Sequence, residues 1–185
     1  MYKQFAKEKL NMSTNAMIYV KQKDDTIKGT YLHWDGYPSY TGNILLNHYE
    51  DIERARELVN LGGLSTIGID INAPEIITRF GFDAMFLPYQ GDIGKRTDLP
   101  EEWRNLSENE RKRLYMDAMD GSYTIAYHRD RNEKKQLTTY KSEKDLKQSK
   151  IKLAYDYYHD GNEWFVRNNK QFQKLTKKYC ESHSY

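Results

Sequence analysis

Two hairpin signatures, one near each end of the chain, place the strongest constraint on the fold. Residues 16–22 and 27–34 have the side-chain composition of strands, and a Lys-Asp-Asp turn separates them. Near the other end, His159-Asp160-Gly161-Asn162 lies between residues 151–158 and 163–167. An Asp-Gly pair between two such runs is typical of a β-hairpin turn. The two hairpins predict an antiparallel sheet.

The residues between the hairpins favour helices. Residues 51–61 repeat apolar side chains at helical spacing and end before Gly62, which is a favourable residue after a helix. Similar patterns predict helices over residues 42–49 and 107–119, and two further helices that begin at Pro100 and Ser142. Residues 122–128 alternate as expected for a strand. For residues 63–100 we expect short helical turns or an insertion. Together, the expected strands and helices predict an α+β fold with an antiparallel sheet of four to five strands and helices packed on one face.

A length of 185 residues favours one domain. We expect this α+β domain to span residues 12–168. The polar, Lys-rich residues 1–11 are interpreted as an N-terminal extension, which leaves open whether Met1 or Met12 is the natural start. Residues 169–185 are interpreted as a basic C-terminal helix or tail.

Composition excludes several classes of protein. Apolar residues make up 38% of the chain and aromatic residues 14%, 16 of them Tyr, which predicts a modest core rich in aromatics. A net charge of +2 creates no overall field that would attract nucleic acid. The single Cys180 excludes a disulfide within the chain and fits a reducing compartment. No apolar run reaches the roughly 20 residues of a membrane helix. We therefore expect a cytoplasmic protein, with no cofactor and no membrane partner.

The densest run of unusual residues follows the first hairpin. His33 and Asp35 are two residues apart, so their side chains point the same way in an extended chain. Such a pair can fix a histidine tautomer, bind a metal ion or transfer protons. In the alternative interpretation, Trp34 and Tyr37 pack on a neighbouring helix while His33 and Asp35 hydrogen-bond the backbone of a tight turn. Both interpretations stay open at this point.

A second His-x-Asp pair occurs at His128 and Asp130, again at a predicted strand end. The two pairs would form a small metal or phosphate site with Arg129 and Arg131 if they converged, and otherwise the second pair belongs to a charged turn. No residue is assigned a catalytic or metal-binding role. The predicted binding residues are His33, Trp34, Asp35, Tyr37, Tyr40, His128, Arg129, Asp130 and Arg131.

Known catalytic motifs do not match. His128-Arg129-Asp130 resembles a kinase catalytic loop, but Lys135 stands where that loop requires Asn, and there is no Gly-rich phosphate loop. Walker A, dinucleotide-binding, nucleophile-elbow and His-Glu-x-x-His motifs are also missing. Lysines and aromatic residues alternate in the C-terminal segment, which fits either a nucleic-acid contact or the solvated face of a helix.

The run from His33 to Pro38, with Gly42, Leu45, Leu46, His48 and Tyr49 after it, resembles a family of small uncharacterised proteins of bacteriophages and prophages. Residues 126–131 and 161–166 are similar to two further landmarks of that family, so the resemblance covers about residues 12–167. It carries no known chemistry. It implies a context in which small phage proteins act inside the host by binding a host or defence component, as anti-CRISPR proteins and sequesterers of immune nucleotides do.

Three hypotheses follow. The first is a non-catalytic phage protein that binds and inhibits or sequesters a host component such as a defence factor. The second is a metal-dependent phosphoesterase or nuclease that uses His33, Asp35, His128 and Asp130. The third is a nucleotide or nucleic-acid binder that uses the basic C-terminal segment. The oligomeric state is not predicted.

Overall fold

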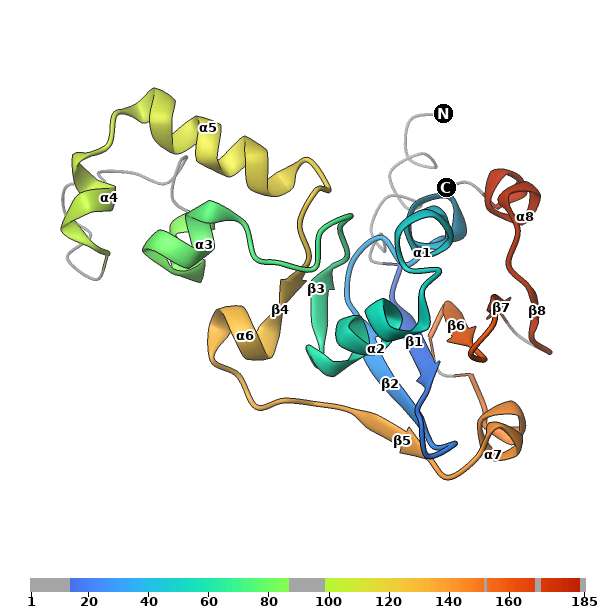
Figure 1. Ribbon diagram of the computed structural model, residues 1–185. Helices are drawn as coiled ribbons and strands as arrows, with labels where there is room; N and C mark the ends of the chain where they lie inside the picture. The colour runs from blue at the N-terminus through green and yellow to red at the C-terminus, as the bar shows by residue number, and fades with distance from the viewer. Residues whose placement is uncertain (1–13, 87–98, 152, 169–170, 184–185) are drawn as a thin grey trace, which may run out of the picture.

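A computed structural model describes residues 14–86, 99–151, 153–168 and 171–183 (Figure 1). Its strands are β1 (Ala16–Lys21), β2 (Ile27–Leu32), β3 (Leu64–Thr66), β4 (Ile125–Ala126), β5 (Thr138–Tyr140), β6 (Tyr155–His159), β7 (Trp164–Arg167) and β8 (Gln173–Lys174). Its helices are α1 (Asn43–His48), α2 (Ile52–Asn60), α3 (Glu75–Phe80), α4 (Glu101–Asn105), α5 (Glu108–Met119), α6 (Tyr127–Arg131), α7 (Glu143–Gln148) and α8 (Lys177–Ser182), with a π-helical turn η1 (Pro38–Gly42) and a 3-10 helix η2 (Phe82–Phe86). The predicted extension, residues 1–11, lies outside the described residues.

Both predicted hairpins are confirmed. β1 pairs antiparallel with β2, from Ala16 opposite Leu32 to Lys21 opposite Ile27, and β6 pairs antiparallel with β7. The prediction of a purely antiparallel sheet of four to five strands is wrong in its detail. The sheet has eight strands in the order β4-β3-β2-β1-β6-β7-β8, with β5 also paired to β2, and the pairs β1–β6 and β2–β3 are parallel. The long helical connection between the hairpins allows β1 and β6 to run in the same direction.

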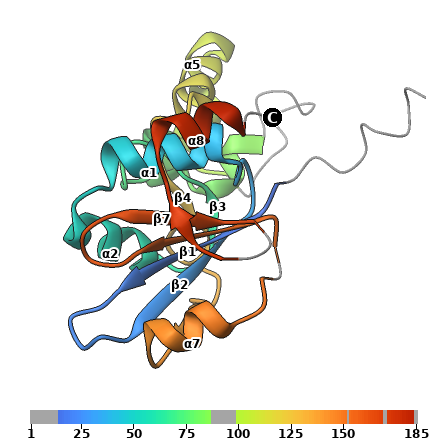
Figure 2. The same cartoon turned by 90° about the vertical axis from the view of Figure 1, so that its right-hand side faces the viewer.

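The two faces of the sheet bury different residues. Ala16, Ile18 and Val20 of β1 face the main core, which α1, α2 and α8 cover (Figure 2). Tyr19, one position out of phase, faces the opposite side together with Leu146 of α7. The prediction that all helices pack on one face is therefore wrong, because the aromatic side chains on this second face are covered by α7.

Local capping explains where several helices begin. The Asp51 carboxylate accepts a hydrogen bond from the backbone N–H of Arg54 at the start of α2, and the Ser142 hydroxyl does the same for α7. Ser107 and Glu110 form a reciprocal capping box at the start of α5. These contacts confirm the predicted helix starts at all three places.

A second buried cluster lies beside the sheet, where α3, α4 and α5 pack together (Figure 1). Phe80 and the fully buried Trp103 meet with ring centroids 5.0 Å apart. Ile125 of β4 belongs to the same cluster and joins it to the sheet. None of the helices in the described ranges combines the length and the apolar character that a membrane span needs.

Two local predictions are correct only in part. In residues 122–128 only Ile125–Ala126 forms a strand, and α6 begins at Tyr127. The Asp130 carboxylate accepts a hydrogen bond from the backbone N–H of Ala126, which stabilises this helix start. The C-terminal segment is not one basic helix, because β8 joins the sheet before α8 begins, and Leu175 and Cys180 lie in the main core.

Candidate functional site

The His33–Pro38 turn is held by the strands on either side of it. The backbone N–H groups of His33 and Trp34 donate to the carbonyls of Leu64 and Ser65, each at 3.0 Å. Asp35 adopts a left-handed conformation, with φ of 56°. This sharp reversal follows directly on β2, so the turn is placed rigidly at the end of the first hairpin.

Gly36 is required by the packing of this turn. A Cβ atom at position 36 would lie 2.6 Å from the Thr14 carbonyl oxygen and 2.8 Å from the Ala16 Cβ. The Gly36 carbonyl accepts a hydrogen bond from the Tyr157 hydroxyl at 2.8 Å, and the Asp35 carbonyl accepts one from the Thr41 hydroxyl at 2.7 Å. The backbone of the turn is thus part of the architecture.

Unlike the backbone of the turn, the Trp34 side chain is accessible to solvent, because Trp34 is 43% exposed. Its ring meets the His33 imidazole edge-on, with centroids 4.5 Å apart. The His33 Nδ1 atom lies 3.0 Å from the Tyr31 hydroxyl, and the His33 ring also contacts Tyr127 of α6. We call the set Tyr31, His33, Trp34 and Tyr127 the aromatic ridge.

The remaining predicted residues of the turn lie deeper. Tyr37 and Tyr40 have ring centroids 6.1 Å apart, and the Tyr40 hydroxyl donates to the Ile67 carbonyl. Burial raises the pKa of the Tyr40 hydroxyl and also that of the Asp35 carboxyl group. Both tyrosines are half-buried, so Trp34 is the more accessible contact residue.

Arg129 and Asp130 hold α6 in place. The Asp130 carboxylate is 2% exposed and accepts both from the backbone N–H of Ala126 and from the Arg129 guanidinium. Arg129 also donates to the carbonyls of Ile71 and Thr124, at 2.6 and 2.5 Å. These contacts give both residues a structural role, and they bury the Asp130 side chain, whereas 29% of the Arg129 side chain stays exposed.

His128 and Arg131 lie on the same short helix. The His128 Nδ1 donates to the Glu133 carbonyl at 2.7 Å. The Arg131 guanidinium lies over the rings of Phe82 and Tyr127, 4.9 and 5.3 Å from their centroids. Arg131 therefore lies beside the aromatic ridge, in contact with Tyr127. One residue predicted from the segment His128–Arg131 is thus close to the residues predicted from the His33–Pro38 turn.

The structure does not assemble a metal site from the two His-x-Asp pairs. Within the described part of the chain, no group of three or more His, Cys, Asp and Glu side chains is arranged to hold a metal ion. Asp130 is also committed to Arg129 and Ala126. The hypothesis of a metal-dependent phosphoesterase thus has no ligand set in these residues.

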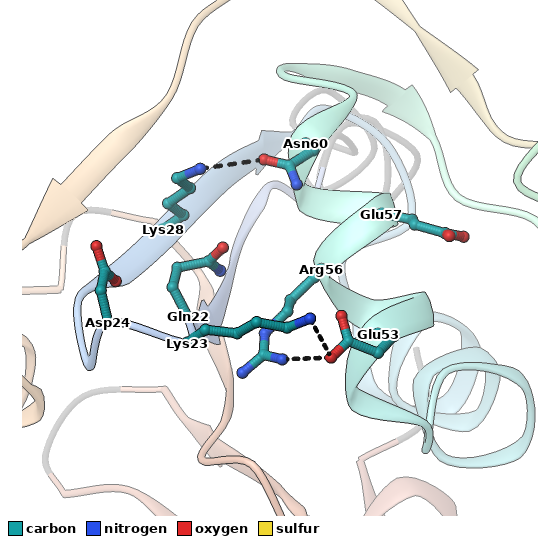
Figure 3. Close-up of a pocket in the computed structure, with 8 residues that line it drawn as sticks. All are labelled: Gln22, Lys23, Asp24, Lys28, Glu53, Arg56, Glu57 and Asn60. Carbon is teal, nitrogen blue, oxygen red and sulfur yellow. Dashed lines mark hydrogen bonds and ion pairs between the residues drawn. The ribbon is translucent and has the colours of Figure 1, made fainter.

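A polar pocket of 450 Å³ lies between the β1–β2 turn and α2 (Figure 3). The Glu53 carboxylate contacts both Lys23, at 3.3 Å, and Arg56, at 2.7 Å. Lys28 reaches Asn60 at 3.4 Å on the other side. Five of the eight residues that line the pocket therefore pair with one another, and we assign this pocket no function.

Sequence reasoning missed a more enclosed pocket of 240 Å³ on the second face of the sheet. Its lining combines three tyrosines with one buried carboxylate. The lining residues are Met17, Tyr19, Tyr31, Thr138, Tyr140, Lys150, Leu153 and Asp156. Alternation along β1 and β2 indicates which of these residues share a face, but local patterns do not reveal the pairing with β5 and β6.

No protein family model, no curated protein and no solved structure matches this chain. A proposed function therefore depends on the geometry of the aromatic ridge.

Proposed function

We propose that this protein is a non-catalytic binding protein, encoded by a bacteriophage or prophage, that captures and inhibits or sequesters a protein of the bacterial host. A host defence factor is the proposed target. The observation that carries the proposal is the exposure of Trp34, at 43%, on a turn whose backbone is fixed by hydrogen bonds to Leu64 and Ser65.

An exposed Trp on a rigid turn suits a protein interface for two reasons. Trp supplies a large contact area, and it is enriched among the few interface residues that carry most of the binding energy. Because the turn is already ordered, little conformational entropy is lost when a partner covers it. The ridge adds His33 and Tyr127, and the Arg131 guanidinium, which pairs with Glu133 at 3.0 Å, lies beside them at its border.

The resemblance of residues 33–38 to phage and prophage proteins supports a role directed at the host. The packing of Arg129 and Asp130 into the structure argues for binding rather than catalysis, because these groups are occupied. The proposed contact residues are therefore Trp34, His33, Tyr127 and Arg131. The half-buried Tyr37 and Tyr40 pack against each other within the turn.

The test is affinity capture from bacteria that carry defence systems, with the full chain as bait. We expect Trp34→Ala to weaken capture of the specific partner about 30-fold, the equivalent of about 2 kcal/mol. Met116→Ala is the matched control, because Met116 is 53% exposed on α5, away from the ridge. Binding constants measured with the purified partner then give the affinity of each variant.

The inhibitory role is tested separately in cells. Expression of the wild-type chain and of Met116→Ala should restore phage plaque formation on defended bacteria, whereas Trp34→Ala should not. Equal capture and equal plaque formation by all three proteins would contradict the proposal.

A further inference from the structure

β5 lies at an edge of the sheet and leaves one side of its backbone unpaired. It pairs antiparallel with β2, with Tyr140 opposite Ile27 and Thr138 opposite Gly29, and within the described part of the chain it has no second neighbouring strand. The chain from α6 to β5 runs along the lower margin of the molecule in Figure 1. An edge strand presents its free N–H and C=O groups to solvent, where a further strand can pair with them.

The alternation of hydrogen bonds in the first hairpin indicates which backbone groups of β5 point outward. The Gln22 N–H donates to the Thr26 carbonyl at 2.8 Å, and in an antiparallel pair every second pair of residues repeats this bonded arrangement. Lys28 therefore bonds to β1, and the residues on either side of it direct their backbone groups toward β5. Thr139 lies opposite Lys28. The N–H and C=O groups of Thr139 consequently point away from the sheet.

The side chains along this edge combine one apolar group with unpaired positive charge. The chain enters β5 from an extended run, residues 133–137 (Figure 1). Lys135, Leu137, Thr139 and Lys141 occupy every second position, so their side chains share one face. Leu137 is 38% exposed, and both lysines are exposed. Neither lysine forms an ion pair with another described residue.

The charge of the edge selects the kind of strand that fits it. The carboxylates at the two ends of the edge, Glu133 and Glu143, already pair with Arg131 and Lys147. The positive charge of the two exposed lysines is therefore not neutralised by these neighbours. Lysines on an edge strand oppose pairing with a second copy of the same edge. Carboxylates on an added strand would instead form favourable cross-strand pairs with them.

We propose that β5 is a docking edge for an acidic, extended segment of a partner protein, which adds to the sheet as a further strand. The backbone of this segment pairs with the outward N–H and C=O groups of Thr139. An apolar side chain covers Leu137, and carboxylates lie against Lys135 and Lys141. In this mode of recognition main-chain hydrogen bonds supply affinity, and alternate side chains supply specificity. The edge is separate from the Trp34 interface, so its failure would leave the proposed function intact.

The test is an NMR titration of the full chain with three short peptides. A peptide of four Val-Glu repeats matches the edge in charge and can form a strand. A peptide of four Val-Lys repeats has the wrong charge, and one of four Pro-Glu repeats has the right charge but lacks the N–H groups and the geometry for a regular strand. We expect only the Val-Glu peptide to bind, and its binding should protect the Thr139 amide from exchange with solvent.

Thr139→Pro tests the backbone contact directly. Proline is tolerated on an edge strand where the N–H faces solvent, so the substitution removes the outward donor and keeps the pairing with β2. Thr139→Ala is the matched control, because it removes the side chain and keeps the N–H group. We expect Thr139→Pro to bind the Val-Glu peptide about tenfold more weakly than Thr139→Ala does.

Charge is tested with two double variants that change the net charge equally. Lys135→Glu with Lys141→Glu should weaken binding of the Val-Glu peptide at least about tenfold. Lys112→Glu with Lys177→Glu, at exposed positions of α5 and α8, should leave it nearly unchanged. Equal weakening by the two double variants would overturn the proposal.

Three further results would also overturn the docking edge. These are no binding of the Val-Glu peptide at millimolar concentration, equal binding of the Val-Lys or Pro-Glu peptide, and equal binding by Thr139→Pro and Thr139→Ala. Urea denaturation confirms that each variant is folded. If Thr139→Pro does not fold, the comparison of the two double variants and of the three peptides decides.

Discussion

At the scale of single residues, His159 joins two distant parts of the chain. Its Nδ1 atom accepts from the backbone N–H of Gly161 at 3.1 Å, so the proton of the neutral ring is on Nε2. That Nε2–H donates to the Glu50 carbonyl at 2.9 Å. Burial lowers the pKa of His159 below its ordinary value of 6.5. Protonation would destroy the contact with Gly161, so the fold requires the neutral ring.

The stability of the protein should therefore depend on pH through His159. The unfolded chain takes up a proton on this side chain near pH 6.5, and the folded protein does so only at lower pH. Between the two pKa values the unfolded state binds more protons, so the free energy of unfolding falls as the pH is lowered. The contribution is fully present above about pH 6.5, and one proton gives a slope of at most about 1.4 kcal/mol per pH unit.

Urea denaturation of the wild type and of His159→Gln between about pH 7.5 and 5 measures this slope. We expect a smaller slope in His159→Gln, because Gln does not titrate in this range. Identical slopes in the two proteins would show that other groups cause the pH dependence.

At the scale of elements, α6 shows how side chains override a strand pattern. Tyr123, Ile125 and Tyr127 alternate as in a strand, yet the chain becomes helical at Tyr127. The Asp130 carboxylate receives the Ala126 N–H and the Arg129 guanidinium, and Arg129 binds the Thr124 carbonyl. These side-chain contacts stabilise one helical turn where the local pattern favours extended structure.

Asp130→Ala should accordingly lower the free energy of unfolding by about 2–3 kcal/mol, because Ala126 and Arg129 both lose their acceptor. Asp117→Ala is the matched control. Asp117 pairs with Arg113 on α5, and both side chains are more than half exposed, so its loss should cost less than about 1 kcal/mol. Urea denaturation compares the two variants, and equal destabilisation would be evidence against the structural role of Asp130.

At the scale of the whole molecule, the two ends of the chain share one core. Cys180 of α8 is fully buried in the cluster that also contains Ile18 of β1, and a Cβ atom at Gly42 would lie 2.8 Å from its sulfur. Burial raises the pKa of the Cys180 thiol to about 11, so the reactive thiolate is scarce at neutral pH. The thiol is thus a probe of whether α8 separates from the core on its own.

Labelling of Cys180 with a thiol reagent should therefore require unfolding of the main core. We expect labelling of the native protein to be about 1,000-fold slower than labelling in concentrated urea, because the unfolded fraction of a stable domain is about one in a thousand or less. A Ser182→Cys variant in a Cys180→Ala background is the control, since position 182 is exposed on the same helix. Equally fast labelling at both positions would indicate that α8 opens independently.

Local chemistry in the sequence was sufficient to place both hairpins and the starts of α2, α5 and α7. Turn residues and helix caps act over a few residues, as Ser107 and Glu110 illustrate, so a short window contains all the partners. The same locality explains why the composition of residues 33–38 alone predicts a stiff turn, since Gly36 and Pro38 act on the backbone at their own positions.

The tertiary structure alone decided which strands pair in parallel, which face each helix covers and what each site residue contacts. β1 pairs with β6 across most of the chain length, and that pairing brings Asp156 beside Tyr19 and Tyr140. The tertiary structure also distinguishes Trp34, which is exposed, from Arg129 and Asp130, which hold α6 in place. In the sequence all three residues are equally good candidates for a binding site. Contacts of this kind form between residues far apart in the chain, and no local pattern encodes them.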